Sequence, residues 1–134
     1  MNIDNLVQNI TPELFEYEQS VLQGFYLFEE ALDANGSLLE SEDWVGAFNG
    51  DVCVGSRQWD TSLCGSGLCD VPAMGDDNSP YSDGYMVSGD IPTFKIYDIS
   101  ENMYYDAEIS TDYSECEDTA ECSWSNFDFN MLDY

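Results

Sequence analysis

Apolar and polar residues alternate with a period of two in several short segments of this chain, which is the pattern of β-strands that place one face in a core. The clearest case is residues 43–55, where DWVGAF and DVCVG flank Asn49-Gly50. An Asn-Gly pair between such segments favours a type I′ turn, because both central residues of that turn need a positive φ. The sequence therefore predicts a β-hairpin here.

Residues 93–109 and 126–134 show the same alternation. TFKIYDI and MYYDAEI flank residues 100–102 and predict a second hairpin, whereas NFDFNMLDY predicts a last strand with its aromatic residues on one face. We expect these strands to be antiparallel and to keep one face in solvent.

Two other segments carry mixed signals. Thr11-Pro12-Glu13 is typical of a helix start, but Gly24 and the apolar run VLQGFYLF favour a strand over residues 20–30, and we expect the strand. Residues 60–92 are rich in Gly, Asp, Ser and Pro and predict a long ordered loop. Loops of this length in compact domains are usually functional or tied down.

Short strands separated by turns, with no second convincing helix, predict an all-β fold: an antiparallel β-sandwich, immunoglobulin-like or jelly-roll, with long disulfide-clipped loops. We expect one such domain over residues 13–134, preceded by an N-terminal arm at 1–12. No stretch of about 18 apolar residues is present, so we expect no membrane insertion. The first residues also lack the basic and apolar regions of a signal peptide.

The chain carries 28 acidic residues against two basic ones and no histidine, a formal net charge of -26. Because nucleic-acid binding depends on Lys and Arg that neutralise phosphates, we expect no nucleic-acid partner. An apolar fraction of 43% with 14% aromatic residues argues for a folded core rather than disorder. The self-repulsion must then be relieved by spreading the carboxylates over solvated faces or by a bound cation.

Acidic and amide side chains crowd the segment CDVPAMGDDNSPYSDGYMVSGD, and calcium takes six to eight such oxygen ligands in a flexible geometry. We predict a Ca2+ site in this loop, with a solvated acidic loop as the alternative; its spacing is not that of an EF-hand. The predicted ligands are Asp70, Asp76, Asp77, Asn78, Asp83 and Asp90. In a second, weaker set a polar turn is the favoured interpretation; its members are Asp33, Asn35, Glu40, Glu42 and Asp43.

The five cysteines bear on the compartment. Cys64 with Cys69, and Cys116 with Cys122, are close enough in sequence to close small loops, and two such disulfides predict an oxidising, extracellular environment. Cys53 is left over within an apolar run, where we expect a buried thiol. A zinc site is disfavoured because there is no histidine and no CxxC motif.

Arg57 and Lys95 are the only basic residues, and each lies in or beside a predicted strand next to an aromatic residue. We expect each to pair with carboxylates and to lie against a ring. Loss of Arg57 would cost about 2–4 kcal/mol if its carboxylate partners are partly buried. The loss would be under about 1 kcal/mol if the pair is an ordinary exposed one.

Three strings, EDWVGAFNGDVCVGSRQWD, CDVPAMGDD and SGDIPTFKIYD, resemble a β-sandwich domain found in large secreted and surface proteins of Bacteroidota-like bacteria. Many of those proteins carry sorting domains of the type IX secretion system, and related modules recur in adhesins and surface polymers. The resemblance covers residues 15–109 and implies an extracellular, non-catalytic module.

Catalysis has little support, because a chain without histidine has no Ser-His or Cys-His nucleophile, and we expect no enzyme. Glycoside hydrolysis needs only two well-placed carboxylates, and nothing in the sequence identifies such a pair. A carbohydrate-binding or adhesion module is the alternative function, with sugar rings stacked on Trp44, Trp59 and Trp124. Asn9 and Asn35 begin N-x-[ST] sequons and are candidate glycosylation sites.

The ends of the chain bear on assembly. The arm at 1–12 could add as a strand to an open sheet edge of a neighbour, which gives a head-to-tail contact and hence a filament. The segment at 126–134 could do the same, and the alternative is that both complete their own sandwich. We therefore predict a structural subunit of an extracellular bacterial filament or surface polymer, a head-to-tail homopolymer stabilised by Ca2+.

Overall fold

The predicted hairpin forms β2 (Trp44–Asn49) and β3 (Val52–Gln58), which pair antiparallel. The computed structural model describes residues 11–28, 31–64, 69–107, 124 and 129–132. Asn49 pairs with Val52, so the connecting residues are Gly50 and Asp51, and of these only Gly50 has a positive φ, at 62°. One positive φ at the first central position is the pattern of a type II′ turn. The hairpin is confirmed, but the type I′ turn on Asn49-Gly50 is wrong, because Asn49 takes part in the strand pairing.

The larger sheet has the strand order β3-β2-β5-β6, with antiparallel neighbours throughout. β5 (Thr93–Asp98) and β6 (Met103–Ala107) form the second predicted hairpin, which is confirmed. Asp98 orders its loop, because its carboxylate accepts hydrogen bonds from the Ser100 backbone N–H at 3.0 Å and from the Ser100 hydroxyl at 2.6 Å.

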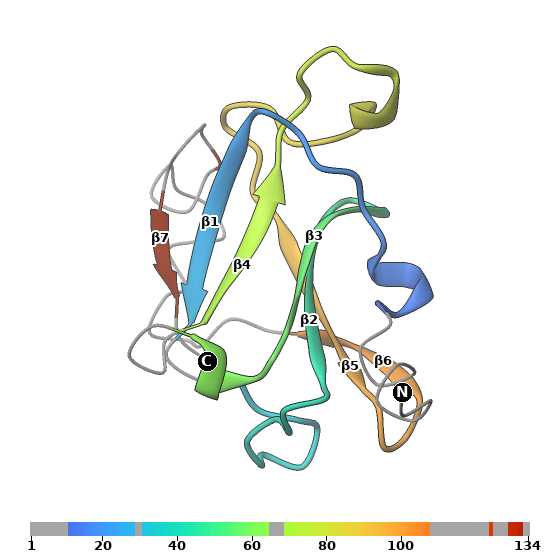
Figure 1. Ribbon diagram of the computed structural model, residues 1–134, viewed down its shortest axis with the longest axis vertical. Coiled ribbons are helices and arrows are strands. Elements are labelled where there is room, and N and C mark those ends of the chain that lie inside the picture. Colours follow the sequence, from blue (N-terminus) through green and yellow to red (C-terminus); the bar gives the residue numbers. More distant parts are fainter. Residues whose placement is uncertain (1–10, 29–30, 65–68, 108–123, 125–128, 133–134) are drawn as a thin grey trace.

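The smaller sheet has the order β4-β1-β7 (Figure 1). β1 (Gln23–Phe28) confirms the strand expected over residues 20–30, while the helical signal before it yields only a single 3-10 turn, η1 (Glu13–Phe15). β7 (Phe129–Leu132) confirms the last predicted strand but runs parallel to β1. The antiparallel expectation is therefore wrong for this pair, since the pairing direction depends on a distant partner that strand periodicity does not reveal.

β4 (Cys69–Met74) lies inside the segment expected to be a long loop, so that expectation is wrong for these residues. β4 pairs antiparallel with β1. Its Pro72 disfavours a strand, because proline has no N–H to donate to a ladder. The structure resolves the conflict by placing β4 at a sheet edge, where β1 is its one partner among the described strands of that sheet.

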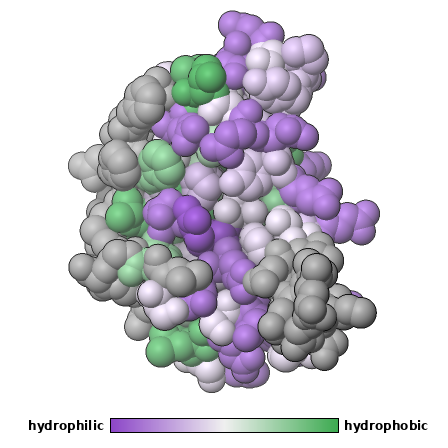
Figure 2. Space-filling model, in the orientation of Figure 1, coloured by the Kyte–Doolittle hydropathy of each residue, from purple (hydrophilic) through white to green (hydrophobic). Residues whose placement is uncertain are grey.

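The two sheets pack against each other, and their inner faces form the main core. Tyr26 and Phe28 of β1 are fully buried, and the Phe28 ring lies edge-on to Phe94 of β5 with centroids 5.1 Å apart. The architecture is the β-sandwich that the sequence predicts. Polar residues cover much of the face shown in Figure 2, with apolar residues scattered between them.

The N-terminal segment covers the outer face of the larger sheet. Phe15 of η1 is fully buried there, with its ring centroid 5.8 Å from Phe48 and 5.4 Å from Tyr104. Gly46 makes room for it, because a Cβ at this position would lie 2.9 Å from the Phe15 ring. The Ser56 hydroxyl donates to the Phe15 carbonyl oxygen at 3.0 Å. The expectation of one solvent-exposed face is therefore wrong for the centre of this sheet.

Candidate functional site

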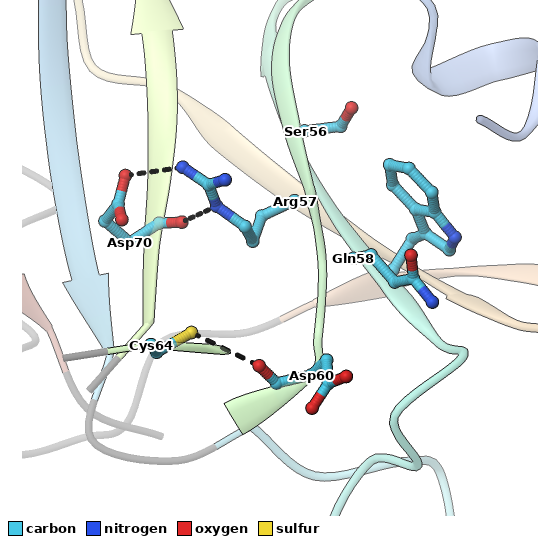
Figure 3. A pocket seen from close by; sticks show the side chains of 7 residues that line it. Ser56, Arg57, Gln58, Asp60, Cys64 and Asp70 are labelled. Carbon is cyan, nitrogen blue, oxygen red and sulfur yellow. Dashed lines mark hydrogen bonds and ion pairs between the residues drawn. The ribbon is translucent and has the colours of Figure 1, made fainter. Parts of the chain in front are cut away.

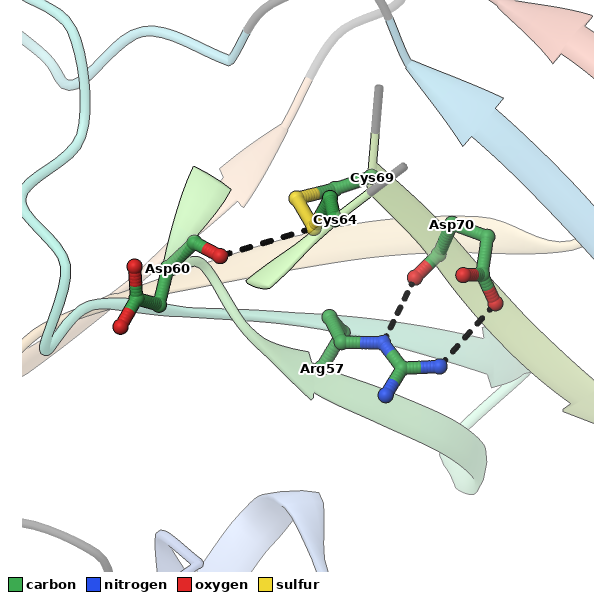
Figure 4. A network of polar contacts seen from close by, with 5 residues as sticks. All are labelled: Arg57, Asp60, Cys64, Cys69 and Asp70. Carbon is green, nitrogen blue, oxygen red and sulfur yellow. Dashed lines mark hydrogen bonds and ion pairs between the residues drawn. A yellow bond between two sulfur atoms is a disulfide. The ribbon is translucent and has the colours of Figure 1, made fainter. Parts of the chain in front are cut away.

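Arg57 and Asp70 join the edges of the two sheets. Arg57 Nε donates to the Asp70 carbonyl oxygen at 3.0 Å, and its Nη2 lies 3.1 Å from an Asp70 carboxylate oxygen (Figure 4). The two side chains are 43% and 34% exposed. An ion pair this exposed contributes under about 1 kcal/mol to the free energy of unfolding. Of the two interpretations of Arg57, the geometry supports the ordinary exposed pair.

A disulfide between Cys64 and Cys69 clips the chain that leads into β4, as the sequence predicts. Just before it, Asp60 caps the 3-10 turn η2 (Thr61–Leu63) and accepts hydrogen bonds from the Ser62 backbone N–H and hydroxyl. The Cys64 sulfur lies 3.6 Å from the Asp60 carbonyl oxygen (Figure 4). The disulfide and the cap therefore hold the entry to β4 beside the end of β3.

These groups line a cleft of about 390 Å³ beside β3 (Figure 3), a size within the range of small-ligand sites. Several of its polar groups already have partners: Gln58 Nε2 donates to the Ser41 carbonyl oxygen at 3.1 Å, and both carboxylates of the cleft accept hydrogen bonds. The arrangement fits a junction between sheets better than a reaction centre. The lining residues are Trp44, Ser56, Arg57, Gln58, Asp60, Cys64 and Asp70.

Ser82 holds the acidic loop after β4 together from within. It is fully buried at the end of η4 (Pro80–Ser82), and its hydroxyl lies 2.9 Å from Asp77 Oδ1 and 3.2 Å from Asp76 Oδ1. Asp77 also accepts hydrogen bonds from the backbone N–H groups of Ser79 at 3.0 Å and Val21 at 3.3 Å. A hydrogen bond from the Ser79 side chain is the largest cause that holds the pKa of Asp77 well below its ordinary value, and the bonds from the Ser82 hydroxyl and from the backbone N–H groups of Ser79 and Val21 add to it.

One of the six predicted calcium ligands, Asp70, lies away from this loop, and another, Asp90, is engaged by other hydrogen-bond donors. Asp70 belongs to the ion pair at the sheet junction, and β4 separates it from Asp76 by about 20 Å at about 3.3 Å per residue. Asp90 Oδ2 accepts hydrogen bonds from the Val87 backbone N–H at 3.0 Å and from the Asn49 side-chain amide at 3.3 Å. The six residues therefore do not form one site.

The other predicted ligands gather near one hollow. Asp76, Asn78 and Asp83 line a space of about 430 Å³, while Asp77 directs a carboxylate oxygen to Ser82. In the part of the chain that the structure describes, no three acidic or cysteine side chains form a group that could hold a metal ion. The hollow thus offers two carboxylates and one amide, which is fewer protein ligands than calcium usually takes.

In the weaker acidic set, the carboxylates of Asp33 and Asp43 bond to backbone groups of turns. Asp33 accepts two backbone N–H bonds within its own turn, in which Asn35 is exposed. Asp43 is buried and accepts hydrogen bonds from the backbone N–H groups of Glu40 at 2.8 Å and Ile99 at 3.0 Å. Burial raises the pKa of Asp43. The favoured interpretation, a polar turn, agrees with these contacts.

The three tryptophans predicted to stack on sugars are buried. Trp44, Trp59 and Trp124 are 8%, 3% and 2% exposed. Trp124 Nε1 donates to the Ala73 carbonyl oxygen at 2.8 Å, and the Trp59 ring lies edge-on to Phe28 at 5.9 Å. The predicted stacking platform is therefore wrong, because these large rings stabilise the protein by filling its cores.

The predictions for Lys95 and Cys53 both concern the aromatic cluster on the outer face of the larger sheet. Lys95 pairs with Asp106, and its Nζ lies 5.5 Å from the centre of the Phe48 ring, so it has both the carboxylate and the ring that the sequence predicts. Cys53 is a buried free thiol in the same cluster. Burial raises the pKa of Cys53 to about 11, so it stays protonated at neutral pH and is a poor nucleophile.

Sequence reasoning missed two residues on which this arrangement depends. Phe15 covers the outer face of the larger sheet, but it stands in ELFEY without a periodic pattern that would reveal its burial. Ser82 is the centre of the acidic loop, and the run DDNSP at 76–80 contains the Asp, Asn and Ser residues whose side chains bond to nearby backbone. That run was the available signal for Ser82, whereas Phe15 offered none.

Comparison with protein-family models, with curated proteins and with solved structures finds no match. The class that the fold defines is an all-β sandwich with a disulfide. The resemblance to surface modules of Bacteroidota stays a prediction. Within the described ranges, no helix has the length and apolar character needed to cross a membrane. Three predictions lie outside the described residues, namely the Cys116–Cys122 disulfide, the sequon at Asn9 and the arm up to residue 10.

Proposed function

We propose that this protein is a non-catalytic structural module of an extracellular assembly, in which a neighbouring copy adds a strand to the open edge of the larger sheet. The observation that carries the proposal is the outer side of β6. This strand ends the sheet order and, among the described residues, pairs only with β5. An edge with unpaired backbone groups is a template for another strand.

The side chains of β6 suit an added strand. Met103 is 49% exposed and Tyr105 is half-buried. The two share one face of the strand, and Tyr105 lies opposite Ile96, a core residue of β5. A strand from a neighbour would extend the core over this apolar row while completing the backbone hydrogen bonds of the edge.

The arm at 1–12 is the donor that fits this edge. β7, which belongs to the other predicted donor segment, already pairs with β1 of its own sheet. The Cys64–Cys69 disulfide supports an oxidising compartment, as extracellular assembly requires. Addition of an N-terminal strand to the β6 edge of the next copy is a head-to-tail contact, which continues into a filament when its rotation does not close a ring.

Calcium is proposed as a stabiliser of this module, at the hollow lined by Asp76, Asn78 and Asp83. The support is the composition, because a formal net charge of -26 opposes compaction and a bound cation relieves part of the repulsion. Binding should be weak, since water would have to supply the remaining ligands.

Negative-stain electron microscopy of the purified protein, with light scattering to measure mass, tests the assembly. Met103→Lys places a charge on the apolar row of β6 and should abolish filaments while preserving the fold, and deletion of residues 1–10 should do the same. Leu38→Lys is the matched control, because Leu38 is 64% exposed in a different part of the molecule. Monomers only in the unmodified protein, or filaments that survive both changes at β6 and in the arm, contradict the proposal.

A further inference from the structure

A third pocket, of about 330 Å³, opens where the N-terminal segment passes the start of β3 and the turn that follows η4. Its volume is in the range of small-ligand sites. Three tyrosines and three carboxylate residues make up most of its wall, and no lysine or arginine contributes. The lining residues are Glu16, Tyr17, Glu18, Val52, Cys53, Tyr81, Asp83 and Tyr85.

The three tyrosines differ in how firmly they are held. Tyr85 is buried, and its hydroxyl accepts a hydrogen bond from the Glu18 backbone N–H at 2.7 Å, which fixes the segment carrying Glu16 and Tyr17 beside it. Tyr17 is half-buried, and Tyr81 is 48% exposed at the mouth. Burial raises the pKa of Tyr17 and Tyr85, so both phenols are neutral at neutral pH. Neutral phenol rings have electron-rich faces that attract cations.

The charges around the pocket favour a cation as well. Glu16, Glu18 and Asp83 are exposed at its rim. The only basic residues of the chain, Arg57 and Lys95, are engaged in ion pairs with Asp70 and Asp106. A second copy of this chain is therefore a poor source of the cation, which must come from a different molecule. The net charge of -26 would raise the local concentration of such a ligand.

We propose that this pocket binds an alkylated ammonium group, such as the trimethylammonium head of choline or of a trimethylated lysine. A bare metal ion is a worse fit, because calcium prefers six to eight oxygen ligands and the wall includes three phenol rings and the Val52 side chain. An alkylated ammonium has no strongly held water to lose, and it gains attraction from the rings and from the rim carboxylates together. This pocket is separate from the β6 edge, so the binding proposal can be tested independently of the assembly proposal.

Equilibrium dialysis with radiolabelled choline tests the proposal, and it works whether or not the protein assembles. We expect saturable binding in the millimolar range, weakened by added salt and displaced by tetramethylammonium. The neutral isostere 3,3-dimethyl-1-butanol has the same shape without the charge and should not displace choline. Absence of saturable choline binding, or equal displacement by the neutral isostere, overturns the proposal.

Substitutions distinguish the contribution of the Tyr81 ring to choline binding from the contribution of the Glu18 charge. Tyr81→Leu keeps apolar contact but removes the ring, and it should weaken choline binding about two- to fivefold, whereas Tyr81→Trp should preserve or strengthen it. Glu18→Gln should also weaken binding, while Glu40→Gln, which removes an exposed charge outside the pocket, should have a smaller effect. Unchanged binding in Tyr81→Leu contradicts the role of the ring. Circular dichroism verifies that each variant is folded.

The source of the ammonium group is a separate question that the same assay answers. Displacement of choline is compared for a short peptide with a trimethylated lysine and for the same peptide with unmodified lysine. Stronger displacement by the methylated peptide than by unlabelled choline identifies a protein partner. Stronger displacement by choline identifies a small-molecule ligand. Equal displacement by the methylated and unmodified peptides would show a simple charge attraction and overturn the assignment to an alkylated group.

Discussion

Gly55 of β3 lies so close to Pro72 of β4 that a Cβ atom at position 55 would be 1.7 Å from the Pro72 carbonyl oxygen. The two strands are edges of different sheets. Their backbones approach this closely because one residue has no side chain and the other, a proline, has no N–H to place in a ladder. The contact lies beside the Arg57–Asp70 pair, so the junction of the sheets combines a steric fit with hydrogen bonds.

Replacing Gly55 with alanine should open this junction. We expect Gly55→Ala to lower the free energy of unfolding by about 3 kcal/mol, because the new methyl group meets backbone that cannot move aside cheaply. Gly50→Ala is the control: it has a positive φ but open space around the Cβ, and it should cost about 1 kcal/mol. Urea denaturation measures the free energy of unfolding of both variants. Equal losses in the two variants would show that the close contact with Pro72 does not add to the cost of a side chain at position 55.

Phe15 should contribute more to the free energy of unfolding than its place near the N-terminus suggests. Phe15→Ala leaves a cavity among the rings of the outer-face cluster, and we expect a loss of about 4 kcal/mol in the free energy of unfolding. Leu14→Ala changes the neighbouring residue, which is 53% exposed, and should cost under about 0.5 kcal/mol. Similar losses for the two variants would mean that η1 contributes little to the fold.

The acidic loop should lose stability at low pH. Because the pKa of Asp77 is lower in the folded protein than its ordinary value of 3.8, the folded state favours the carboxylate, and the resulting stability is present above that value. As the pH falls below about 4, protonation of the Asp77 carboxylate removes this contribution to stability. We expect the acid-induced fall in unfolding free energy to be smaller in Asp77→Asn. Asp51→Asn, an exposed change in the β2–β3 turn, should leave the fall unchanged, and an unaltered profile in Asp77→Asn would contradict the prediction.

Calcium should stabilise the protein more than sodium at the same ionic strength. Both salts screen the repulsion of a chain with a net charge of -26, but only a bound ion adds stabilisation by mass action. We expect the Tm to be higher by a few degrees in CaCl2, and the difference to vanish in the double variant Asp76→Asn, Asp83→Asn. Identical melting of the unmodified protein in the two salts, or after chelation, would remove calcium from the proposed function.

Several elements could be predicted from the sequence because their cause is local. β2 with β3, and β5 with β6, are neighbours along the chain, so alternation and a short connection are sufficient to predict them. The Cys64–Cys69 disulfide follows from a separation of five residues. The large number of acidic residues likewise predicts, without a structure, that much of the surface is solvated. In the hairpins and the disulfide, the interacting residues lie close together in sequence.

The remaining features depend on residues that are distant in sequence, and no local pattern reports them. The sequence by itself determined the strand-rich sandwich, its hairpins, the local disulfide and the excess of negative charge. Only the tertiary structure decided that β4 is a strand despite Pro72, that β7 runs parallel to β1, and that the tryptophans fill the core. Trp124 bonds to Ala73 across 51 positions of the chain. Such pairings are selected by the packing and hydrogen bonding of the whole fold, which alternation along one strand does not encode.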